Sequence, residues 1–203
     1  MDIYSAEFLI SNTTFKKCPE DKKPEFAFIG RSNVGKSSLL NMLTGKKKLA
    51  KISSTPGKTQ LINHFTINDE WYLVDLPGYG YAKAPKKSRS SWEHFISEYL
   101  LHRSLLLTTF VLIDSRLEPQ KIDIEFMNWC GEKGIPFSII FTKTDKLSSS
   151  ALQKKISTYK KEMLKQWAEL PPIFITSSQS NFGRESVLNY LDVILSSFRQ
   201  THS

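Results

Sequence analysis

The chain has 203 residues, of which 40% are hydrophobic and 24% are charged, a composition that indicates one globular domain and excludes a disordered, collagen-like or coiled-coil chain. Lysine and arginine (28) outnumber aspartate and glutamate (20), so the formal net charge is +8, which favours nucleic acid or another anionic surface as a partner. The two cysteines cannot build a disulfide framework. We find no signal peptide and no apolar run of about 20 residues, and therefore expect a cytoplasmic protein with no membrane partner.

Short apolar segments alternate with longer amphipathic ones, the pattern of an α/β domain with a mostly parallel sheet. Residues 1–23 are expected to form an N-terminal arm packed on a domain made by residues 24–200. Strands are predicted at 26–29, 60–67, 71–74, 108–113, 136–141 and 173–175, and helices at 37–43, 91–103, 119–131, 148–169 and 184–198. Residues 46–59 and 78–91 are rich in Lys, Ser, Thr and Gly and are predicted to be mobile loops.

A phosphate-binding loop is predicted directly after the first of these strands. Residues 30–37 read Gly-Arg-Ser-Asn-Val-Gly-Lys-Ser and match the pattern G-x-x-x-x-G-K-[ST]. In this pattern backbone N–H groups and a helix N-terminus surround the phosphates. Lys36 would bridge the outer phosphates, and the Ser37 hydroxyl would bind Mg²⁺. A chance glycine- and serine-rich turn is the alternative, but it would not also follow an apolar strand and open a helix.

Two further segments are typical of the γ-phosphate end of such a site. Asp75-Leu76-Pro77-Gly78 closes a predicted strand, so that Asp75 could hold Mg²⁺ through water and the Gly78 N–H could meet the γ-phosphate. A strand that ends in a Pro-Gly turn is the plain alternative. Thr59, in the first loop, is the candidate for a switch threonine that completes the Mg²⁺ shell, and Thr55 competes with it.

Guanine recognition is predicted at the ends of the last two strands. The Asp145 carboxylate of Thr142-Lys143-Thr144-Asp145 can accept hydrogen bonds from N1–H and the exocyclic amine of guanine, whereas adenine would leave it unpaired. Lys143 would lay its alkyl stem over the base, and backbone N–H groups of residues 176–178 could meet the guanine O6. Because α/β sheets bind ligands at the carboxyl ends of their strands, these motifs together predict one guanine-nucleotide site.

With these motifs in place, residues 24–178 resemble the EngB (YihA/YsxC) family of bacterial ribosome-assembly GTPases, within the translation-factor class of P-loop GTPases. The resemblance rests on residues 24–41, 55–63, 75–82, 142–145 and 176–178. It implies a Ras-like fold with a six-stranded, mostly parallel sheet, one antiparallel edge strand and helices on both faces. It also implies slow Mg²⁺-dependent GTP hydrolysis, association with the large ribosomal subunit and its rRNA, and through that role an effect on cell division and septation. Thr142 replaces the asparagine of general GTPases but matches this family, so that guanine selectivity rests mainly on Asp145.

The resemblance also implies which residues hold the ligands. It assigns Mg²⁺ to Ser37, Thr59 and Asp75, and catalysis to Lys36, Asn33 and Thr59. Nucleotide contacts are assigned to Gly30, Arg31, Ser32, Asn33, Val34, Gly35, Lys36, Ser37, Ser38, Gly57, Lys58, Thr59, Gln60, Leu61, Asp75, Leu76, Pro77, Gly78, Thr142, Lys143, Thr144, Asp145, Thr176, Ser177 and Ser178.

The position after Gly78 carries Tyr79 instead of the glutamine that orients the attacking water in other GTPases. A phenol cannot both accept and donate as an amide does, so we expect slow intrinsic turnover that a partner or a cation stimulates. Asn33 resembles the asparagine that holds K⁺ beside the phosphates in relatives lacking that glutamine. The alternative is that Asn33 is only a turn residue that tolerates a left-handed backbone.

Basic residues gather in the two predicted loops. Lys46, Lys47, Lys48 and Lys51 lie in or beside the first, Lys83, Lys86, Lys87 and Arg89 lie in the second, and Tyr79, Tyr81 and Trp92 are interspersed among them. Each cluster alone is typical of a solvated face, but two clusters on nucleotide-sensing loops predict a surface for rRNA phosphates. The lysines at 154–165 are interpreted as the solvated face of a helix.

The sequence leaves three other functions to consider. We also expect the protein to be a monomer. A GTP-gated signalling switch would bind a protein effector in place of RNA. A scaffold would bind GTP and scarcely hydrolyse it. An ATP-dependent kinase is disfavoured by Lys143 and Asp145, which point to guanine.

Overall fold

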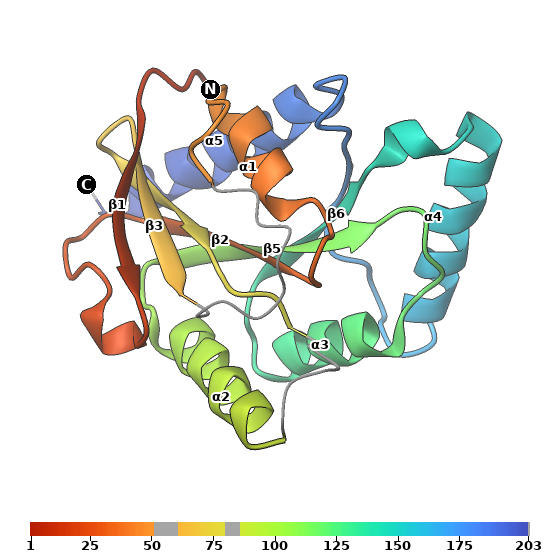
Figure 1. Cartoon of the computed structure of the whole chain (residues 1–203), viewed down its shortest axis with the longest axis horizontal. Helices are drawn as coiled ribbons and strands as arrows, with labels where there is room; N and C mark the ends of the chain where they lie inside the picture. The colour runs from red at the N-terminus through yellow and green to blue at the C-terminus, as the bar shows by residue number, and fades with distance from the viewer. Residues whose placement is uncertain (51–60, 80–85, 203) are drawn as a thin grey trace.

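We describe the chain from a computed structural model, which covers residues 1–50, 61–79 and 86–202. One seven-stranded sheet, with the order β1-β3-β4-β2-β5-β6-β7, runs through the molecule (Figure 1). Its strands are β1 (Ala6–Asn12), β2 (Glu25–Gly30), β3 (Ile62–Ile67), β4 (Trp71–Asp75), β5 (Leu106–Asp114), β6 (Phe137–Thr142) and β7 (Ile173–Ile175). The helices are α1 (Lys36–Thr44), α2 (Lys86–His102), α3 (Lys121–Glu132), α4 (Ser149–Met163) and α5 (Arg184–His202), with 3₁₀ turns η1 (Phe15–Lys17) and η2 (Thr144–Lys146).

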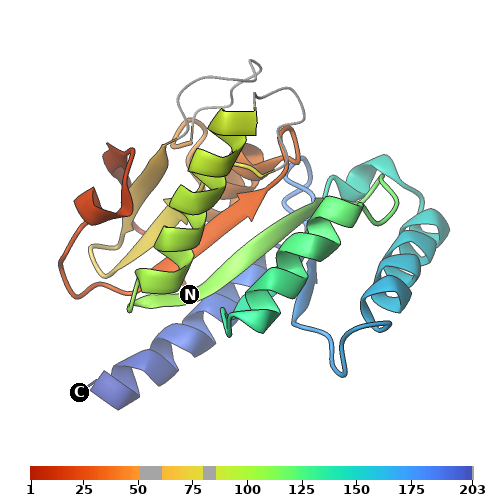
Figure 2. The same ribbon diagram turned by 90° about the horizontal axis from the view of Figure 1, so that it is seen from below.

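Helices cover both faces of the sheet, as the alternation of side chains along the central strands requires. Phe26 and Phe28 of β2 pack with α1 and α5 on one face. Ala27 and Ile29, one residue out of phase, pack with α2, α3 and α4 on the other face. Figure 2 shows α2 and α3 in front of the strands and α5 behind them. The predicted α/β fold class, with a mostly parallel sheet between two helical layers, is therefore confirmed.

The strand order places a ligand-binding edge beside β2. β2 pairs in parallel with β4 on one side and with β5 on the other, so the chain leaves β2 in one direction and later returns to its opposite side. Such a change of direction opens a crevice at the carboxyl ends of the strands. The segments that follow β2, β4, β6 and β7 all start from this edge.

The prediction of six strands was wrong, because part of the N-terminal arm is a strand of the same sheet. β1 pairs antiparallel with β3 from Ala6 opposite Ile67 to Asn12 opposite Ile62, with an irregularity between Phe8 and Ile10. The Asn68 side chain also fastens this end, since its Oδ1 accepts hydrogen bonds from the Tyr4 and Ser5 N–H groups at 2.8 and 3.1 Å. β3 runs antiparallel to both of its neighbours, β1 and β4.

Three helix boundaries differ by more than two residues from those predicted. α2 begins at Lys86, inside the segment expected to be a loop. α5 continues to His202. α4 ends at Met163 instead of residue 169, because the chain then turns so that Trp167 packs edge-on against Phe137, with ring centroids 5.4 Å apart, and donates a hydrogen bond to the Asn128 side chain at 2.6 Å.

Within the part of the chain that the structure describes, none of the helices combines the length and the apolar character that crossing a membrane requires.

Candidate nucleotide-binding site

The loop between β2 and α1 is shaped by residues that accept unusual backbone conformations. Asn33 and Gly35 have φ angles of 61° and 102°, the left-handed region that most side chains disfavour. Gly30 lies so close to β5 that a Cβ atom there would be 2.9 Å from the Leu112 carbonyl oxygen. The loop therefore folds back over the end of β2 and leads into α1 at Lys36, as a phosphate-binding loop does.

Lys36 and Asp75 form an ion pair at the mouth of this loop. Asp75 closes β4, is buried, and also accepts a 3.4 Å hydrogen bond from the Asn63 side chain of β3. Burial lowers the pKa of Lys36 to about 7. The Asp75 carboxylate and the hydroxyl of Ser37, the residue next to Lys36, are oxygen donors of the kind that Mg²⁺ prefers, so the donor set fits that ion.

The segment after Asp75 packs directly on the loop. The Leu76 N–H donates to the Phe28 carbonyl at 3.0 Å, which continues the β4–β2 ladder to the edge of the site. A Cβ atom on Gly78 would lie 2.6 Å from the Gly30 carbonyl oxygen. Only glycine therefore permits this close approach of the two backbones.

Tyr79 turns away from the loop and into the core. Its ring is buried and stacks on Phe126 of α3, with centroids 4.6 Å apart and ring planes 22° from parallel. Burial and the nearby Asp123 carboxylate raise the pKa of Tyr79 well above its ordinary value. The side chain at the position of the water-orienting glutamine thus belongs to the core, and it is not one of the aromatic residues exposed beside the basic loops.

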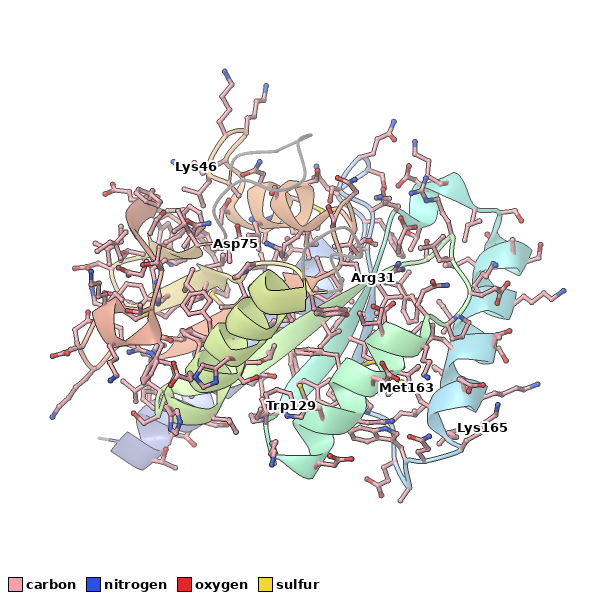
Figure 3. The ribbon with its side chains drawn as sticks, turned by 60° about the horizontal axis from the view of Figure 1, so that its bottom comes forward. Arg31, Lys46, Asp75, Trp129, Met163 and Lys165 are labelled. Carbon is pink, nitrogen blue, oxygen red and sulfur yellow. The ribbon has the colours of Figure 1, made fainter. Side chains whose placement is uncertain are left out.

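The side chain of Arg31 is held against α3. Its Nε donates to Asp123 of α3 at 3.1 Å, and Figure 3 shows Arg31 above that helix. Asp123 is almost fully buried, and burial raises its pKa. Any contact of Arg31 with a nucleotide therefore comes from its backbone, and Asp123 is a partner that the sequence analysis did not identify.

Thr142, at the end of β6, ties the base-recognition segment to the phosphate loop. Its hydroxyl lies 2.6 Å from the Val34 carbonyl oxygen, to which it donates, and 3.2 Å from that of Ile113. The threonine that replaces the usual asparagine therefore has a definite contact in this fold.

Lys143 lies across the same loop in a left-handed backbone conformation, with a φ of 58°. Its Nζ donates to the Asn33 carbonyl at 2.5 Å and to Asp114 Oδ2 at 2.9 Å. Burial of Asp114 disfavours ionisation, but hydrogen bonds from Arg116 and Lys143 outweigh it and lower its pKa to about 2. The sequence analysis did not identify Asp114, although it closes a predicted strand with a carboxylate just as Asp75 does.

Asp145 meets the loop that follows β7. Its Oδ1 accepts a hydrogen bond from the Ser177 hydroxyl at 2.7 Å, and this bond is the main cause that lowers the pKa of Asp145. The Thr144 hydroxyl donates to the Thr176 carbonyl at 3.1 Å. The structure therefore brings the 142–145 and 176–178 segments together at the edge where the phosphate loop also lies.

Several predicted site residues cannot be placed. Gly57, Lys58, Thr59 and Gln60 lie outside the described residues, as do Thr55, Lys51, Lys83 and Tyr81. Leu61 is described and is half-buried just before β3. The structure places the backbone of four further residues in α2 but does not describe their side chains: Lys86, Lys87, Arg89 and Trp92.

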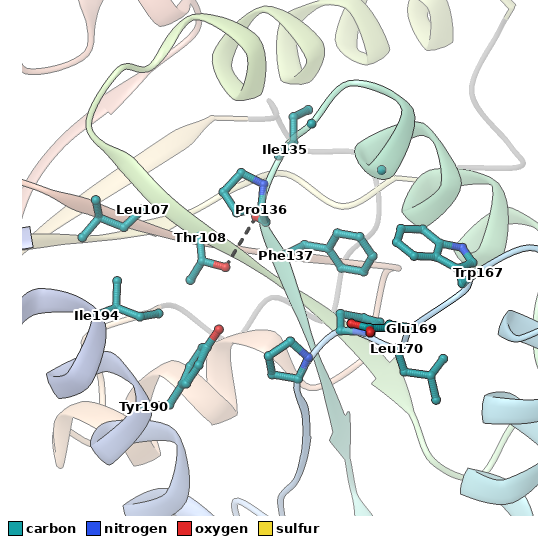
Figure 4. A pocket seen from close by; sticks show the side chains of 14 residues that line it. Leu107, Thr108, Ile135, Pro136, Phe137, Trp167, Glu169, Leu170, Tyr190 and Ile194 are labelled. Atoms are coloured by element: carbon teal, nitrogen blue, oxygen red, sulfur yellow. Dashed lines mark hydrogen bonds between the residues drawn. The ribbon is translucent and has the colours of Figure 1, made fainter. Parts of the chain in front are cut away.

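A cavity of about 590 Å³ lies at the opposite edge of the sheet (Figure 4). It is lined by the beginnings of β5 and β6 together with Trp167, Leu170, Pro172 and Tyr190. None of its lining residues is basic and none belongs to the predicted site. It therefore offers no positive charge to a phosphate and is distinct from the nucleotide site.

The fold, together with the loops at the carboxyl ends of the strands, defines the class of the protein: it is a P-loop GTPase. A family model described as "50S ribosome-binding GTPase" matches residues 25–143, more than half of the chain. The chain belongs to the EngB family of GTP-binding proteins. Probable GTP-binding proteins EngB from Bacteroides fragilis, Phocaeicola vulgatus and Porphyromonas gingivalis are 63%, 59% and 60% identical to it over 194 residues, which cover 96% of this chain and 96%, 97% and 96% of theirs.

Solved structures support the same fold. The crystal structure of a probable GTP-binding protein EngB matches with a TM-score of 0.69 and 22% identity, over 85% of this chain and 99% of that one. A bacterial selenocysteine-specific elongation factor matches with a TM-score of 0.60 and 19% identity, over 87% of this chain and 29% of that one. At these identities the likeness concerns the fold alone.

Proposed function

We propose that the protein binds GTP and GDP, hydrolyses GTP slowly with Mg²⁺, and acts in the cytoplasm as a nucleotide-gated switch in assembly of the large ribosomal subunit, with an effect on cell division and septation through that role. One observation carries the nucleotide part of this proposal. The Lys36–Asp75 pair, the Thr142–Val34 contact and the Asp145–Ser177 contact converge at one edge of the sheet. The ribosomal part is supported by the description of the matching family model.

In this proposal each group at the edge has one task. Lys36 neutralises the outer phosphates, the loop N–H groups surround them, and Asp145 accepts from the guanine edge while Lys143 spans the base and the loop. Ser37, Asp75 and Thr59 would hold Mg²⁺, which supplies charge neutralisation when bound. Residues 57–61 and 75–78 would sense the γ-phosphate, ordering the two loops in the GTP form.

Slow turnover follows from the position of Tyr79. Because its ring is stacked on Phe126 in the core, it cannot orient a water molecule at the γ-phosphate. We propose that a partner or a K⁺ ion held by Asn33 compensates. Turnover measured in matched K⁺ and Na⁺ buffers tests the ion, and equal rates in the two buffers would exclude it.

The guanine assignment is tested by Asp145→Asn. We expect GDP to bind about 10- to 150-fold more weakly, because hydrogen bonds to a charged group are worth about 1.5–3 kcal/mol. Xanthosine diphosphate should bind better than to the wild type, since its C2 carbonyl can accept from the new amide. Titration with fluorescent nucleotide analogues measures both effects.

The matched control is Asp192→Asn, which changes a half-exposed carboxylate on α5. It should leave both affinities unchanged. If Asp145→Asn weakens GDP and xanthosine diphosphate equally, Asp145 does not read the base.

The ribosomal role is tested by co-sedimentation with purified large subunits, in GDP or a non-hydrolysable GTP analogue, at low and high salt. We expect binding that prefers the GTP form and weakens with salt, because lysine–phosphate contacts release counterions. No binding in either nucleotide state would contradict the ribosomal role and make a protein effector the leading partner.

A further inference from the structure

An exposed aromatic ring stands beside the nucleotide site on a backbone that is held in place. We call residues 177–183 the Phe182 loop, after Phe182, whose exposed fraction is 60%. The Ser177 N–H donates to the Phe182 carbonyl at 3.1 Å, and the Arg184 N–H donates to the Asn181 carbonyl at 3.4 Å. At Gly183 the φ angle is 79°, and a Cβ atom would collide with the Ile175 carbonyl oxygen. The ring is therefore presented by a loop with little freedom to bury it.

Three consecutive lysines are presented in the same way just after α1. Lys46, Lys47 and Lys48 are exposed, and none of them forms an ion pair with a residue that the structure describes. The Asn41 side chain fastens their segment, accepting from the Ala50 N–H at 2.8 Å and donating to the Ala50 carbonyl at 3.1 Å. Figure 3 shows Lys46 where this segment leaves α1.

Arg184 joins the two segments. Its guanidinium donates to the Met42 and Leu43 carbonyls at the end of α1, both at 2.9 Å, and Figure 1 shows the start of α5 next to α1. Lys46 follows Leu43 by three residues and Phe182 precedes Arg184 by two, at most about 11 and 7 Å of chain. Neither residues 44–50 nor residues 176–184 contain an acidic side chain.

We propose that Phe182 and the lysines 46–48 form a docking surface for unpaired RNA nucleotides, with one base stacked on the Phe182 ring and neighbouring phosphates on the lysines. Exposed lysines complement an anion, and an exposed ring offers a base the sequence-tolerant stacking that single-stranded nucleic acids use. A duplex hides its base faces and would meet only the lysines. The proposal rests on the proposed function for the ribosomal origin of the RNA, and it adds an aromatic contact outside the two switch segments.

Fluorescence anisotropy with a labelled single-stranded 12-nucleotide RNA and with a blunt-ended RNA duplex tests the surface. We expect Phe182→Leu to weaken binding of the single strand about tenfold and to leave binding of the duplex unchanged, because only the stack is lost. Phe182→Trp should restore the single-strand affinity. Replacement of all three lysines by alanine should weaken both RNAs and lower the slope of log affinity against log salt by about 2 for the single strand.

Two control variants separate this surface from general effects. Phe8→Leu changes a ring on β1 with an exposed fraction of 55%, and alanine at Lys154, Lys160 and Lys161 removes the same charge from exposed positions on α4. Neither control should change RNA binding, and GDP affinity verifies that each variant is folded. If Phe182→Leu behaves like Phe8→Leu, or the two triple variants behave alike, the proposal is wrong.

Co-sedimentation with large subunits distinguishes a failure here from a failure of the proposed function. If wild type and Phe182→Leu sediment equally with subunits and also bind the single-stranded RNA with equal affinity, the docking surface is excluded and the ribosomal role stands. If only subunit binding depends on Phe182, a protein covers the ring and the RNA proposal is overturned. If only the single strand depends on Phe182, the surface is supported without a ribosomal role.

Discussion

The hydroxyl of Thr142 joins two parts of the site that are 108 residues apart in the chain. One short hydrogen bond to the Val34 carbonyl links the end of β6 to the phosphate loop. It therefore fixes the base-recognition segment relative to the phosphate-binding segment. Since this contact needs only a hydroxyl, serine should replace threonine here and valine should not.

We therefore expect Thr142→Val to weaken GDP binding and to lower the free energy of unfolding by about 1–3 kcal/mol, because the Val34 carbonyl loses its donor in a buried place. Thr142→Ser keeps the donor and should stay close to wild type. Urea unfolding and fluorescent-GDP titration measure the two quantities. Equal effects of the two substitutions would contradict this role of the hydroxyl.

Asp114 is a second single residue on which the base site depends, through Lys143. Asp114→Asn keeps the size of the side chain and removes its charge, so the Lys143 ammonium loses its charged partner, and GDP should bind about tenfold more weakly. In a double-mutant cycle with Lys143→Met, we expect a coupling of about 1–3 kcal/mol in GDP binding. Arg116→Ala removes the other donor to Asp114, and it provides a second cycle with Asp114→Asn. If Asp114 couples with Arg116 in GDP binding but not with Lys143, this positioning role is contradicted.

At the scale of elements, the Phe182 loop depends on Gly183 for two separate reasons, a positive φ and the nearness of the Ile175 carbonyl. Gly45 shares the first, with a φ of 68°, but has open space around a Cβ atom. We expect Gly45→Ala to cost about 1–2 kcal/mol in the free energy of unfolding, from backbone strain alone. Gly183→Ala should cost at least about 2 kcal/mol more, which urea unfolding would detect. Equal costs would show that the loop can move away from β7.

The elements that hold the site could be predicted because each shows a strong local pattern. β2, β5 and β6 are rich in apolar residues and end in polar motifs, and the pattern of the phosphate loop lies in consecutive residues. β1 could not be identified as a strand because its partner, β3, lies far along the chain, and edge-strand pairing depends on such context. The contacts of Asp114 and Asp123 depend on which helices and loops meet in space, so no spacing in the sequence indicated them.

At the scale of the whole molecule, a buried charge cluster connects the N-terminal segment, the sheet and α2. Glu25, at the start of β2, has no exposed surface and accepts hydrogen bonds from Tyr99 at 2.5 Å and from Arg103. Arg103 also donates to the Pro19 carbonyl at 2.8 Å. Although burial opposes ionisation of Glu25, the neighbouring His64, Arg103 and Tyr99 outweigh it and lower the pKa of Glu25.

Because the folded pKa of Glu25 is lower than its unfolded value of about 4.3, its stabilising contribution is present above that value and is lost as pH falls through the folded pKa. Glu25→Gln should lower the free energy of unfolding at pH 7 by about 3–5 kcal/mol, since Arg103 loses its buried partner. The remaining stability should fall less steeply between pH 5 and pH 3 than in the wild type. Urea unfolding across this range measures both, and parallel curves would contradict the role of Glu25.

The pairing of β1 with β3 also has a consequence for how the chain is made. Translation delivers Asn12 fifty residues before Ile62, its partner in the ladder. Until the β3–β4 hairpin has emerged, the nascent segment Phe8-Leu9-Ile10 has no strand to join, and such unpaired apolar segments are the ones that aggregate. The outer strand of the finished sheet is therefore synthesised well before the strand on which it packs, and during translation it needs protection until that neighbour is available.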